Sequence, residues 1–307
     1  MSGSRVPGTH LRYFRKNIWL YGMMVPLVVF YFMFRYLPMY GVLIAFKDFY
    51  FRKGILGSPW VGLKNFEYLF SLDKFSQVFT NTVVINFFRL AFGFPMPIIV
   101  SLMLNELTNL KFKRFVQTMI YLPHFISWVV LSGFLLNILS LNGGALNNLL
   151  SFFGAKPIGF LSDETYFRGT LVVTNIWKEF GWGTLVYMAA LSGINNDLYE
   201  AAMVDGANRW QRMLHITLPS LIPTIVTLLI MRVGQLMNTG FEQVFVLNNP
   251  AVYRVADIID TYAYRIGLNE GRYSLASAVG LFKSVINCGL LLAVNWISRH
   301  AFREGIV

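Results

Sequence analysis

Charged residues are scarce in this chain of 307 residues. Only 13% of them are Asp, Glu, Lys or Arg, while 55% are hydrophobic. An average soluble domain carries about 25% charged residues, so a soluble fold of this length would lack the polar surface that it needs. The mean hydropathy is +0.53, and several apolar stretches approach the roughly 20 residues that cross a bilayer. The sequence therefore predicts a multi-pass protein of the cell (plasma or inner) membrane.

Cysteine and metal-binding patterns are also nearly missing. The single cysteine, Cys288, cannot form an internal disulfide or a multi-cysteine metal site, and we interpret it as a packing residue. The histidines His10, His124, His215 and His300 lack metal-ligand spacing to one another and to the cysteine. The sequence therefore predicts that this chain binds no metal and no cofactor and carries no catalytic centre.

A phosphate-binding loop of the type G-x-x-x-x-G-K-[ST] does not occur, and the chain lacks even a Gly-Lys dipeptide. If ATP drives this protein, another chain binds the nucleotide. The formal net charge is +11. We attribute it to basic loops that face an anionic membrane surface rather than to a nucleic-acid site. The sequence also lacks an internal repeat, a low-complexity linker and a soluble domain, so we expect one domain.

Six apolar segments predict an all-α membrane protein with six transmembrane helices. They lie near residues 18–34, 78–104, 114–140, 169–193, 219–237 and 274–297. Helices are expected because backbone polar groups in lipid must be hydrogen-bonded within their own segment. Proline interrupts several of them, at Pro26, Pro95, Pro97, Pro123 and Pro223. We divide the chain into a cytoplasmic segment 1–17, a six-helix domain 18–300 and a cytoplasmic tail 301–307.

The orientation of the spans is predicted from Lys and Arg in the loops. Arg35, rather than a small-residue cleavage site, follows the first run, so we expect an uncleaved span with its N-terminus inside. The cytoplasmic segments 1–17, 105–113, 194–218 and 298–307 then hold ten Lys or Arg in about 60 residues, against a similar number in about 95 outer residues. Both termini lie inside, and the longer loops near 47–77, 141–168 and 238–273 lie outside.

A long motif with fixed spacing occupies the loop between the fourth and fifth spans. It reads Glu200-Ala201-Ala202-Met203-Val204-Asp205-Gly206, followed nine residues later by Ile216-Thr217-Leu218-Pro219. Residues 198–204 predict a short helix capped by Asn195 or Asn196, with Asp197 and Glu200 in its first turn. Gly206 is expected to end this helix in a left-handed conformation. The pattern E-A-A-x-x-x-G-x9-I-x-L-P resembles the cytoplasmic loop signature of permeases in binding-protein-dependent ABC importers.

That resemblance implies a type I importer permease fold with both termini inside. Its partners would be a second homologous permease, two ATPase subunits that bind ATP and Mg²⁺, an extracytoplasmic solute-binding protein and membrane lipid. The coupling loop 194–218 would dock in a cleft of an ATPase, with Glu200 paired to a basic residue there and Gly206 setting the turn. The residues implied to couple the two chains are Glu200, Ala201, Ala202, Asp205, Gly206, Arg209, Leu218 and Pro219.

Further segments resemble the oligosaccharide branch of these permeases. They are residues 37–49, residues 57–63 and Tyr121-Leu122-Pro123. The similarity extends from about residue 18 to 300 and is to the Gram-positive group for complex, often uronate-containing, oligosaccharides. It implies that this chain imports an oligosaccharide from a binding protein and is not itself an enzyme.

Polar residues within the spans are candidates for the substrate path, because transporter sites tend to lie near the bilayer midplane. Helical spacing places them on one face of the fourth span, with Tyr187 off that face, and largely on one face of the fifth. Interhelical hydrogen bonding is the alternative role for Asn and Gln. The candidates are Asn175, Lys178, Glu179 and Trp182 in the fourth span, Arg232, Gln235, Asn238 and Thr239 in the fifth, and the basic residues Arg89 and Lys283 elsewhere.

The charged residues within the spans predict the sign of the substrate's charge. A basic residue at a helix centre costs roughly 2.5–3.5 kcal/mol, so it should face a cavity or a partner. Glu179 is the one acid in the spans, against four basic residues, Arg89, Lys178, Arg232 and Lys283. We therefore expect a cavity that prefers anions and an acidic, uronate-containing oligosaccharide, with a neutral oligosaccharide as the alternative.

Three alternatives remain open from the residues alone. A permease of the same class for another solute, such as glycerol phosphate or a peptide, would carry the same loop motif. An ion-coupled secondary transporter should show an acidic relay and an inverted repeat, whereas the spans offer only Glu179. A membrane-embedded enzyme would need acidic motifs in its loops, for which Asp257 and Asp260 are the nearest candidates.

Overall fold

A computed structural model of the chain describes residue 13, residues 16–238 and residues 240–302. Most of the predicted cytoplasmic segment 1–17, most of the tail 301–307 and the substrate-path candidate Thr239 lie outside the described residues. Within the described ranges the protein is helical, apart from its loops and one isolated antiparallel bridge between Lys47 and Trp60.

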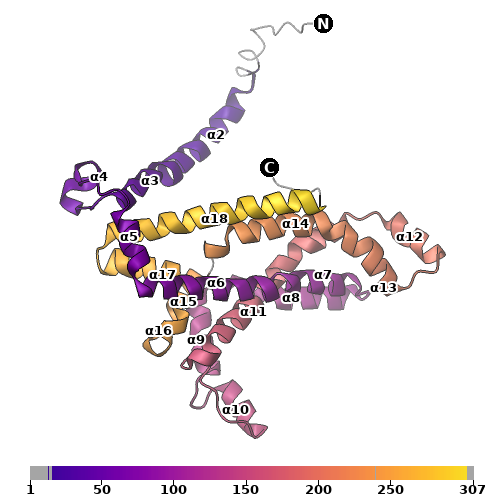
Figure 1. Cartoon of the computed structure of the whole chain (residues 1–307). Helices are drawn as coiled ribbons and strands as arrows, with labels where there is room; N and C mark the ends of the chain where they lie inside the picture. The colour runs from indigo at the N-terminus through magenta and orange to yellow at the C-terminus, as the bar shows by residue number, and fades with distance from the viewer. Residues whose placement is uncertain (1–12, 14–15, 239, 303–307) are drawn as a thin grey trace.

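The first apolar segment stands apart from the rest of the molecule at its start, whereas its last turns pack against the C-terminal helix α18 (Tyr273–Phe302). It runs through α2 (Ile18–Tyr31), a π-helical turn (Phe32–Tyr36), α3 (Leu37–Met39) and a 3-10 helix (Tyr40–Phe46). No residue of α2 is buried, and Figure 1 shows this helix leaving the bundle at an angle. Its apolar side chains are therefore open to lipid or to another chain.

The other helices form a bundle that α18 and α14 border along one side (Figure 1). In Figure 1, α12 and α13 lie at one end of the bundle and α5 and α17 at the other. The first half of the chain forms α4 (Gly54–Gly57), α5 (Lys64–Ser71), α6 (Asp73–Gly93), α7 (Pro95–Asn105), α8 (Leu110–Phe125), α9 (Trp128–Ile138) and α10 (Ala145–Phe152). The second half forms α11 (Glu164–Ser192), α12 (Asn196–Val204), α13 (Arg209–Arg212), α14 (Leu218–Gly234), α15 (Phe241–Leu247), α16 (Tyr253–Ala256), α17 (Ile259–Tyr264) and α18 (Tyr273–Phe302).

Short helical turns join several of these elements. Two π-helical turns precede α14 and follow α17, and 3-10 turns stand before α4, after α14 and before α16. Their bounds are Met213–Thr217, Arg265–Asn269, Phe51–Lys53, Leu236–Asn238 and Pro250–Val252.

Four helical stretches among the described residues are long and apolar enough to cross a membrane, and they match four of the six expected spans. They are Ile18–Phe46, Asp73–Asn105, Arg209–Gly234 and Tyr273–His300. α11 has the length, at 29 residues, but it is too polar to meet the same criterion. The six-span count and the orientation therefore stay predictions.

The expected third span, 114–140, is divided into two helices, α8 and α9, near the proline that was expected to interrupt it. α8 and α9 meet at an angle of 102°. Pro123 removes a backbone donor in the last turn of α8, and the Ser127 side chain begins α9 by accepting a hydrogen bond from the Val130 N–H at 3.3 Å. The sequence indicated a proline break here but not the sharp change in direction.

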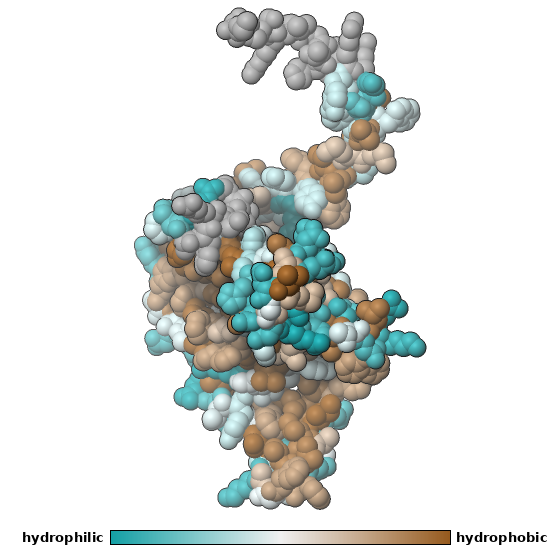
Figure 2. Space-filling view, turned by 90° about the vertical axis from the view of Figure 1, so that its right-hand side faces the viewer, coloured by the Kyte–Doolittle hydropathy of each residue, from teal (hydrophilic) through white to brown (hydrophobic). Residues whose placement is uncertain are grey.

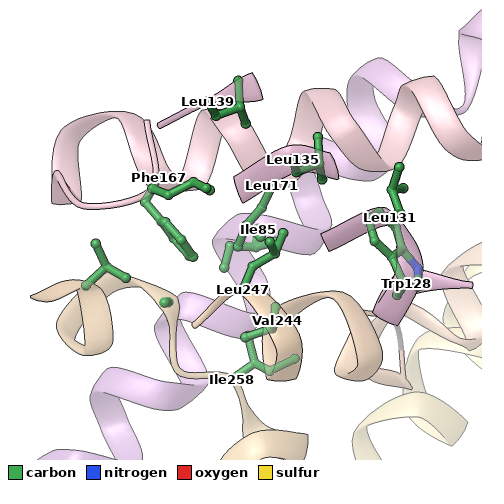
Figure 3. Packing of buried hydrophobic residues seen from close by; sticks show 13 residues of the cluster. Ile85, Trp128, Leu131, Leu135, Leu139, Phe167, Leu171, Val244, Leu247 and Ile258 are labelled. Atoms are coloured by element: carbon green, nitrogen blue, oxygen red, sulfur yellow. The ribbon is translucent and has the colours of Figure 1, made fainter. Parts of the chain in front are cut away.

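Buried apolar side chains hold the centre of the bundle together. One cluster joins α6, α9, α11 and α15 through residues that include Ile85, Leu135, Leu171 and Val244, and Figure 3 shows these side chains converging. A second cluster packs α5 and α6 against α17 and α18, and a third joins α11 to α14. Together they fix α6, α11 and α14 relative to one another.

A buried carboxylate fixes the end of the bundle that carries α17. Asp257 is fully buried, and its Oδ2 lies 2.5 Å from Arg265 Nη2 and 3.6 Å from Lys74 Nζ. Its Oδ1 accepts a hydrogen bond from the Thr261 hydroxyl at 2.8 Å. A buried charge needs such partners, so Asp257 has a structural role here rather than the catalytic one considered as an alternative.

Gly181 lets α11 lie directly against α8. A Cβ atom at this position would collide with the backbone carbonyl oxygen of Ile120, which no side-chain movement can relieve. Small residues allow such close approach between membrane helices. Gly169 lies on the same helix but faces open space.

We expect Gly181→Ala to lower the thermal unfolding temperature of the purified protein in nanodiscs. Overpacking of this kind costs about 1–3 kcal/mol. The matched control, Gly169→Ala, should be neutral or slightly stabilising, because alanine is the better helix former by about 1 kcal/mol. Equal unfolding temperatures for the two variants would contradict the close contact between α8 and α11.

Candidate functional site

A cavity of about 680 Å³ opens between α6, α7, α11, α14 and the segment that follows α14. It is called the interhelical cavity below. Seven predicted substrate-path residues line it: Arg89, Asn175, Glu179, Trp182, Arg232, Gln235 and Asn238. Tyr187 also lines it, although its spacing along α11 placed it off the polar face. The helical spacing in the fourth and fifth spans therefore identified six of the polar and aromatic residues of this wall.

One wall of the interhelical cavity carries a stacked pair of rings. The Trp182 side chain packs on the His124 ring with centroids 4.6 Å apart and an interplanar angle of 5°. His124 Nδ1 in turn lies 3.0 Å from Glu179 Oε2. Trp182 remains 43% exposed and lines the cavity, so part of its surface is available to a ligand. Flat aromatic surface suits the apolar face of a pyranose ring.

Sequence reasoning left His124 without a role, because it is an isolated histidine 55 residues away from Glu179. It lies in the last turn of α8, immediately after Pro123. The sharp bend after α8 brings this turn against α11. Position next to a helix-ending proline was the available signal, and by itself it does not identify a partner.

Lys178, a substrate-path candidate, is not among the residues that line the cavity. Its side chain is buried, and Nζ donates a hydrogen bond to the His124 carbonyl oxygen at 2.7 Å. It also lies 3.5 Å from Glu179 Oε1 and over the Trp128 ring at 5.6 Å. Carbonyl groups at a helix C-terminus lack intrahelical donors and favour a cation, so Lys178 stabilises the end of α8.

Lys283 was also expected in the cavity and is not there. It forms an ion pair with Asp260, which lies on α17 outside the predicted spans. The two side chains are only 17% and 18% exposed. A carboxylate from the loop before α18 therefore neutralises this cation, which the count of charges within spans could not anticipate.

The remaining charges of the interhelical cavity are balanced rather than strongly positive. Arg89 and Arg232 line it together with Glu179 and Glu242. The spans were expected to give the cavity four basic residues and one acid. Its lining instead contains two basic and two acidic residues. Glu179 has His124 and Lys178 as neighbours at 3.0 and 3.5 Å, whereas Glu242, which sequence reasoning missed, is exposed.

The two arginines have different surroundings. Arg89 is buried, and its guanidinium donates to Gln243 Oε1 at 2.5 Å and to Asn86 Oδ1 at 3.3 Å. Gly240, with φ +97°, lies against this guanidinium where any Cβ atom would collide with it. Arg232 is instead exposed within the cavity wall. Arg89 thus has a fixed position, and Arg232 is the accessible cation.

The motif loop folds largely as its local sequence predicts. α12 begins at Asn196, and the Asn195 side chain caps it by accepting a hydrogen bond from the Asp197 N–H at 3.1 Å. Gly206 has φ +80°, with the Gly206 N–H bonded to the Met203 carbonyl and the Ala207 N–H to the Ala202 carbonyl. These two bonds make a Schellman ending. The helix begins two residues earlier than expected, so Glu200 lies in its second turn rather than its first.

The surface of α12 and α13 is open. Glu200, Ala201, Asp205 and Arg209 are exposed, while Ala202 is half-buried. Large apolar side chains are exposed among them: Leu198, Met203, Val204 and Trp210. Figure 2 looks onto the end that carries α12 and α13, where a hydrophilic centre is flanked by apolar surface. Mixed polar and apolar surface of this kind is typical of a protein interface.

Pro219 is the second residue of α14, at the expected start of the fifth span, next to the half-buried Leu218. The helical path nevertheless begins earlier, because one continuous stretch runs from Arg209 to Gly234. The π-helical turn Met213–Thr217 ends two residues before the proline. A proline ring clashes with the carbonyl four residues earlier, and the wider π turn relieves that clash.

Comparison with known proteins gives related sequences over most of the chain. Residues 93–303 match the family of binding-protein-dependent transport system inner membrane components. Protein LplB of Bacillus subtilis (strain 168) is 42% identical over 292 residues, covering 95% of this chain and 92% of that protein. The polygalacturonan/rhamnogalacturonan transport system permease protein YteP of the same organism is 43% identical over 288 residues, covering 94% and 90%.

Solved structures show the same fold. A chain in the crystal structure of a bacterial ABC transporter involved in the import of the acidic polysaccharide alginate is 40% identical and superposes with a TM-score of 0.88. The match covers 96% of this chain and 99% of that chain. A second structure, of a bacterial alginate ABC transporter with an alginate pentasaccharide-bound periplasmic protein, gives the same TM-score at 39% identity.

Removing one member of the Lys283–Asp260 pair should destabilise the protein without changing its substrate affinity. We expect Lys283→Met to cost about 3–5 kcal/mol, because it leaves a largely buried carboxylate without its cation. The double variant Lys283→Met/Asp260→Leu should recover most of that loss. Thermal unfolding in nanodiscs measures the stability, and an altered KM for substrate in Lys283→Met would instead return Lys283 to the substrate path.

Proposed function

Because this chain belongs to the family of binding-protein-dependent transport system inner membrane components, we propose that its interhelical cavity carries acidic oligosaccharides and that loop 194–218 couples it to an ATPase. The chain is the membrane-embedded permease subunit of an ATP-driven oligosaccharide importer and is not an enzyme. A binding protein delivers substrate to transporters of this family. We further propose that this chain assembles with a second permease and two ATPase subunits, and that individual residues have the roles given below.

The accessible guanidinium of Arg232 is the main support for an acidic substrate. It is exposed in a cavity that also presents Trp182 and the side-chain amides of Asn175 and Gln235. Arginine recognises carboxylates through paired N–H donors. Lys178 and His124 lie next to Glu179 and offset its charge. Two relatives support the same substrate class: one belongs to a transporter involved in the import of the acidic polysaccharide alginate, and the other is named a polygalacturonan/rhamnogalacturonan transport system permease protein.

Glu242 favours a second candidate. An exposed carboxylate in the same wall would repel a densely charged polyuronate, and it suits the hydroxyl groups of a neutral oligosaccharide. Neutral oligosaccharides are therefore the alternative substrate class.

The arrangement of spans follows from the proposed roles. We place α12 and α13 in the cytoplasm, with both chain termini inside and six spans in total. In this arrangement α8 and α9 together form a broken third span, and the polar α11 is the fourth. A polar span is tolerated because its polar residues face the cavity or neighbouring helices rather than lipid.

We propose that α12 is the element that docks on the ATPase. It is an exposed helix that presents apolar side chains next to Glu200. None of its residues is buried against the rest of the molecule. The residues assigned to this contact are Glu200, Ala201, Ala202, Asp205, Gly206 and Arg209, with Leu218 and Pro219 at the start of the fifth span.

Variants of the loop test the coupling role. We expect Gly206→Ala and Glu200→Ala to lower the substrate transported per ATP hydrolysed by about fivefold or more. In Gly206→Ala the left-handed residue acquires a strain of about 1–2 kcal/mol that reshapes the end of α12. Transport and hydrolysis are measured in proteoliposomes that contain the co-expressed partner permease, ATPase and binding protein.

The control for backbone strain is Gly154→Ala. Gly154 has a similar φ of +79° and an open surrounding, but it lies in the loop after α10. It should retain the wild-type ratio of transport to hydrolysis. Loss of coupling in Gly154→Ala, or normal coupling in both loop variants, would refute the assignment of loop 194–218.

A charge variant tests the substrate class. We expect Arg232→Gln to raise the KM for an acidic oligosaccharide by roughly tenfold or more, because a hydrogen bond to a charged group contributes about 1.5–3 kcal/mol. The KM for a neutral oligosaccharide of equal length should not change. Arg299→Gln, in the last turn of α18, is the matched control. If the transporter carried only neutral oligosaccharides efficiently, the acidic substrate would be refuted and the neutral class supported.

A further inference from the structure

Little packing holds α12 to the rest of the molecule. None of its residues is buried. The Tyr199 side chain is half-buried, and its hydroxyl lies 3.0 Å from Oγ1 of Thr217, which is 1% exposed. Within the part of the chain that the structure describes, no other side-chain hydrogen bond joins α12 to a different helix. The position of α12 therefore depends on this contact.

Thr217 also has a neighbour in its own helix. Its Oγ1 lies 3.5 Å from the Arg212 carbonyl oxygen, which can only accept. In the bond between Tyr199 and Thr217 either hydroxyl can donate. The Tyr199–Thr217 bond ends inside the π-helical turn Met213–Thr217, where the Leu218 N–H bonds to the Met213 carbonyl five residues earlier. Tyr199 thus contacts the one wide turn of this helix.

The helix that contains this turn leads to the interhelical cavity. The stretch Arg209–Gly234 has 26 residues, so it is about 39 Å long at 1.5 Å per residue. Met231 and Arg232 near its far end, and Gln235 just beyond it, line the cavity. A displacement applied at Thr217 is therefore carried by a single helix to residues that face the substrate.

We propose that the Tyr199–Thr217 hydrogen bond links α12 to the helix Arg209–Gly234, and that Tyr199 is a positioning residue for coupling. The inference rests on the proposed role of loop 194–218. The bond fixes α12 to the π-helical turn, so a movement of α12 shifts the start of the long helix. π-helical turns carry an inserted residue and are frequent at functional sites, where a change of register is possible. Without the bond, α12 moves independently of the cavity wall.

Substitution of the two hydroxyl groups tests this link. Tyr199→Phe and Thr217→Val each remove one partner and keep the packing volume close to that of the wild type. We expect each to lower the substrate transported per ATP hydrolysed by roughly two- to tenfold, the range that the loss of one net hydrogen bond predicts. The double variant should be no worse than either single variant, because both remove the same bond. The assay uses the complete co-expressed transporter in proteoliposomes.

Three controls separate the possible outcomes. Thr217→Ser keeps the hydroxyl and should restore wild-type coupling, and Tyr166→Phe removes a phenol at the start of α11 and should have no effect. Normal coupling in Tyr199→Phe, or losses that multiply in the double variant, would overturn the link. If Glu200→Ala is also fully coupled, the assignment of the loop itself fails. If Glu200→Ala uncouples and Tyr199→Phe does not, only the present inference fails.

Discussion

Polar groups inside the lipid region of this protein must find partners within the protein, because hydrocarbon offers no hydrogen bonds. The helical architecture follows from this constraint, and so do the contacts of the charged residues. Lys178 donates to the open carbonyl of His124 at the end of α8, Lys283 pairs with Asp260, and Arg89 donates to Gln243. Each of these contacts joins two different helices. The bundle is therefore held by charged groups that are hydrogen-bonded or ion-paired, as well as by its apolar clusters.

The interhelical cavity consists of what these contacts leave accessible. Once Lys178 and Lys283 are engaged elsewhere, Arg232 and Glu242 are the exposed charged groups among its described lining residues. Trp182 keeps part of its surface open because His124 covers one side of its ring. A cavity with an aromatic surface, amides and a few separated charges suits a carbohydrate better than a small inorganic ion. This is the chemistry expected of an oligosaccharide permease.

The motif loop, which we place outside the lipid, is shaped by a different constraint. Its helix is defined by its own caps, Asn195 at the start and Gly206 at the end, rather than by burial. A short helix with exposed apolar side chains is suited to contact another chain. In the coupling that we propose, its attachment through Tyr199 to a helix that reaches the cavity lets a small docking element act on a distant site.

Local rules in the sequence determined the helical spans, the polar faces of α11 and α14, and the capped helix with its left-handed Gly206. These features depend on residues within a few positions of one another. The tertiary structure alone decided the bend between α8 and α9, the partners of Lys178 and Lys283, and the place of His124 behind Trp182. Lys178 meets a carbonyl 54 residues away, and Lys283 meets a carboxylate 23 residues away. Helical spacing fixes the face on which a side chain lies, whereas its partner depends on how distant helices pack.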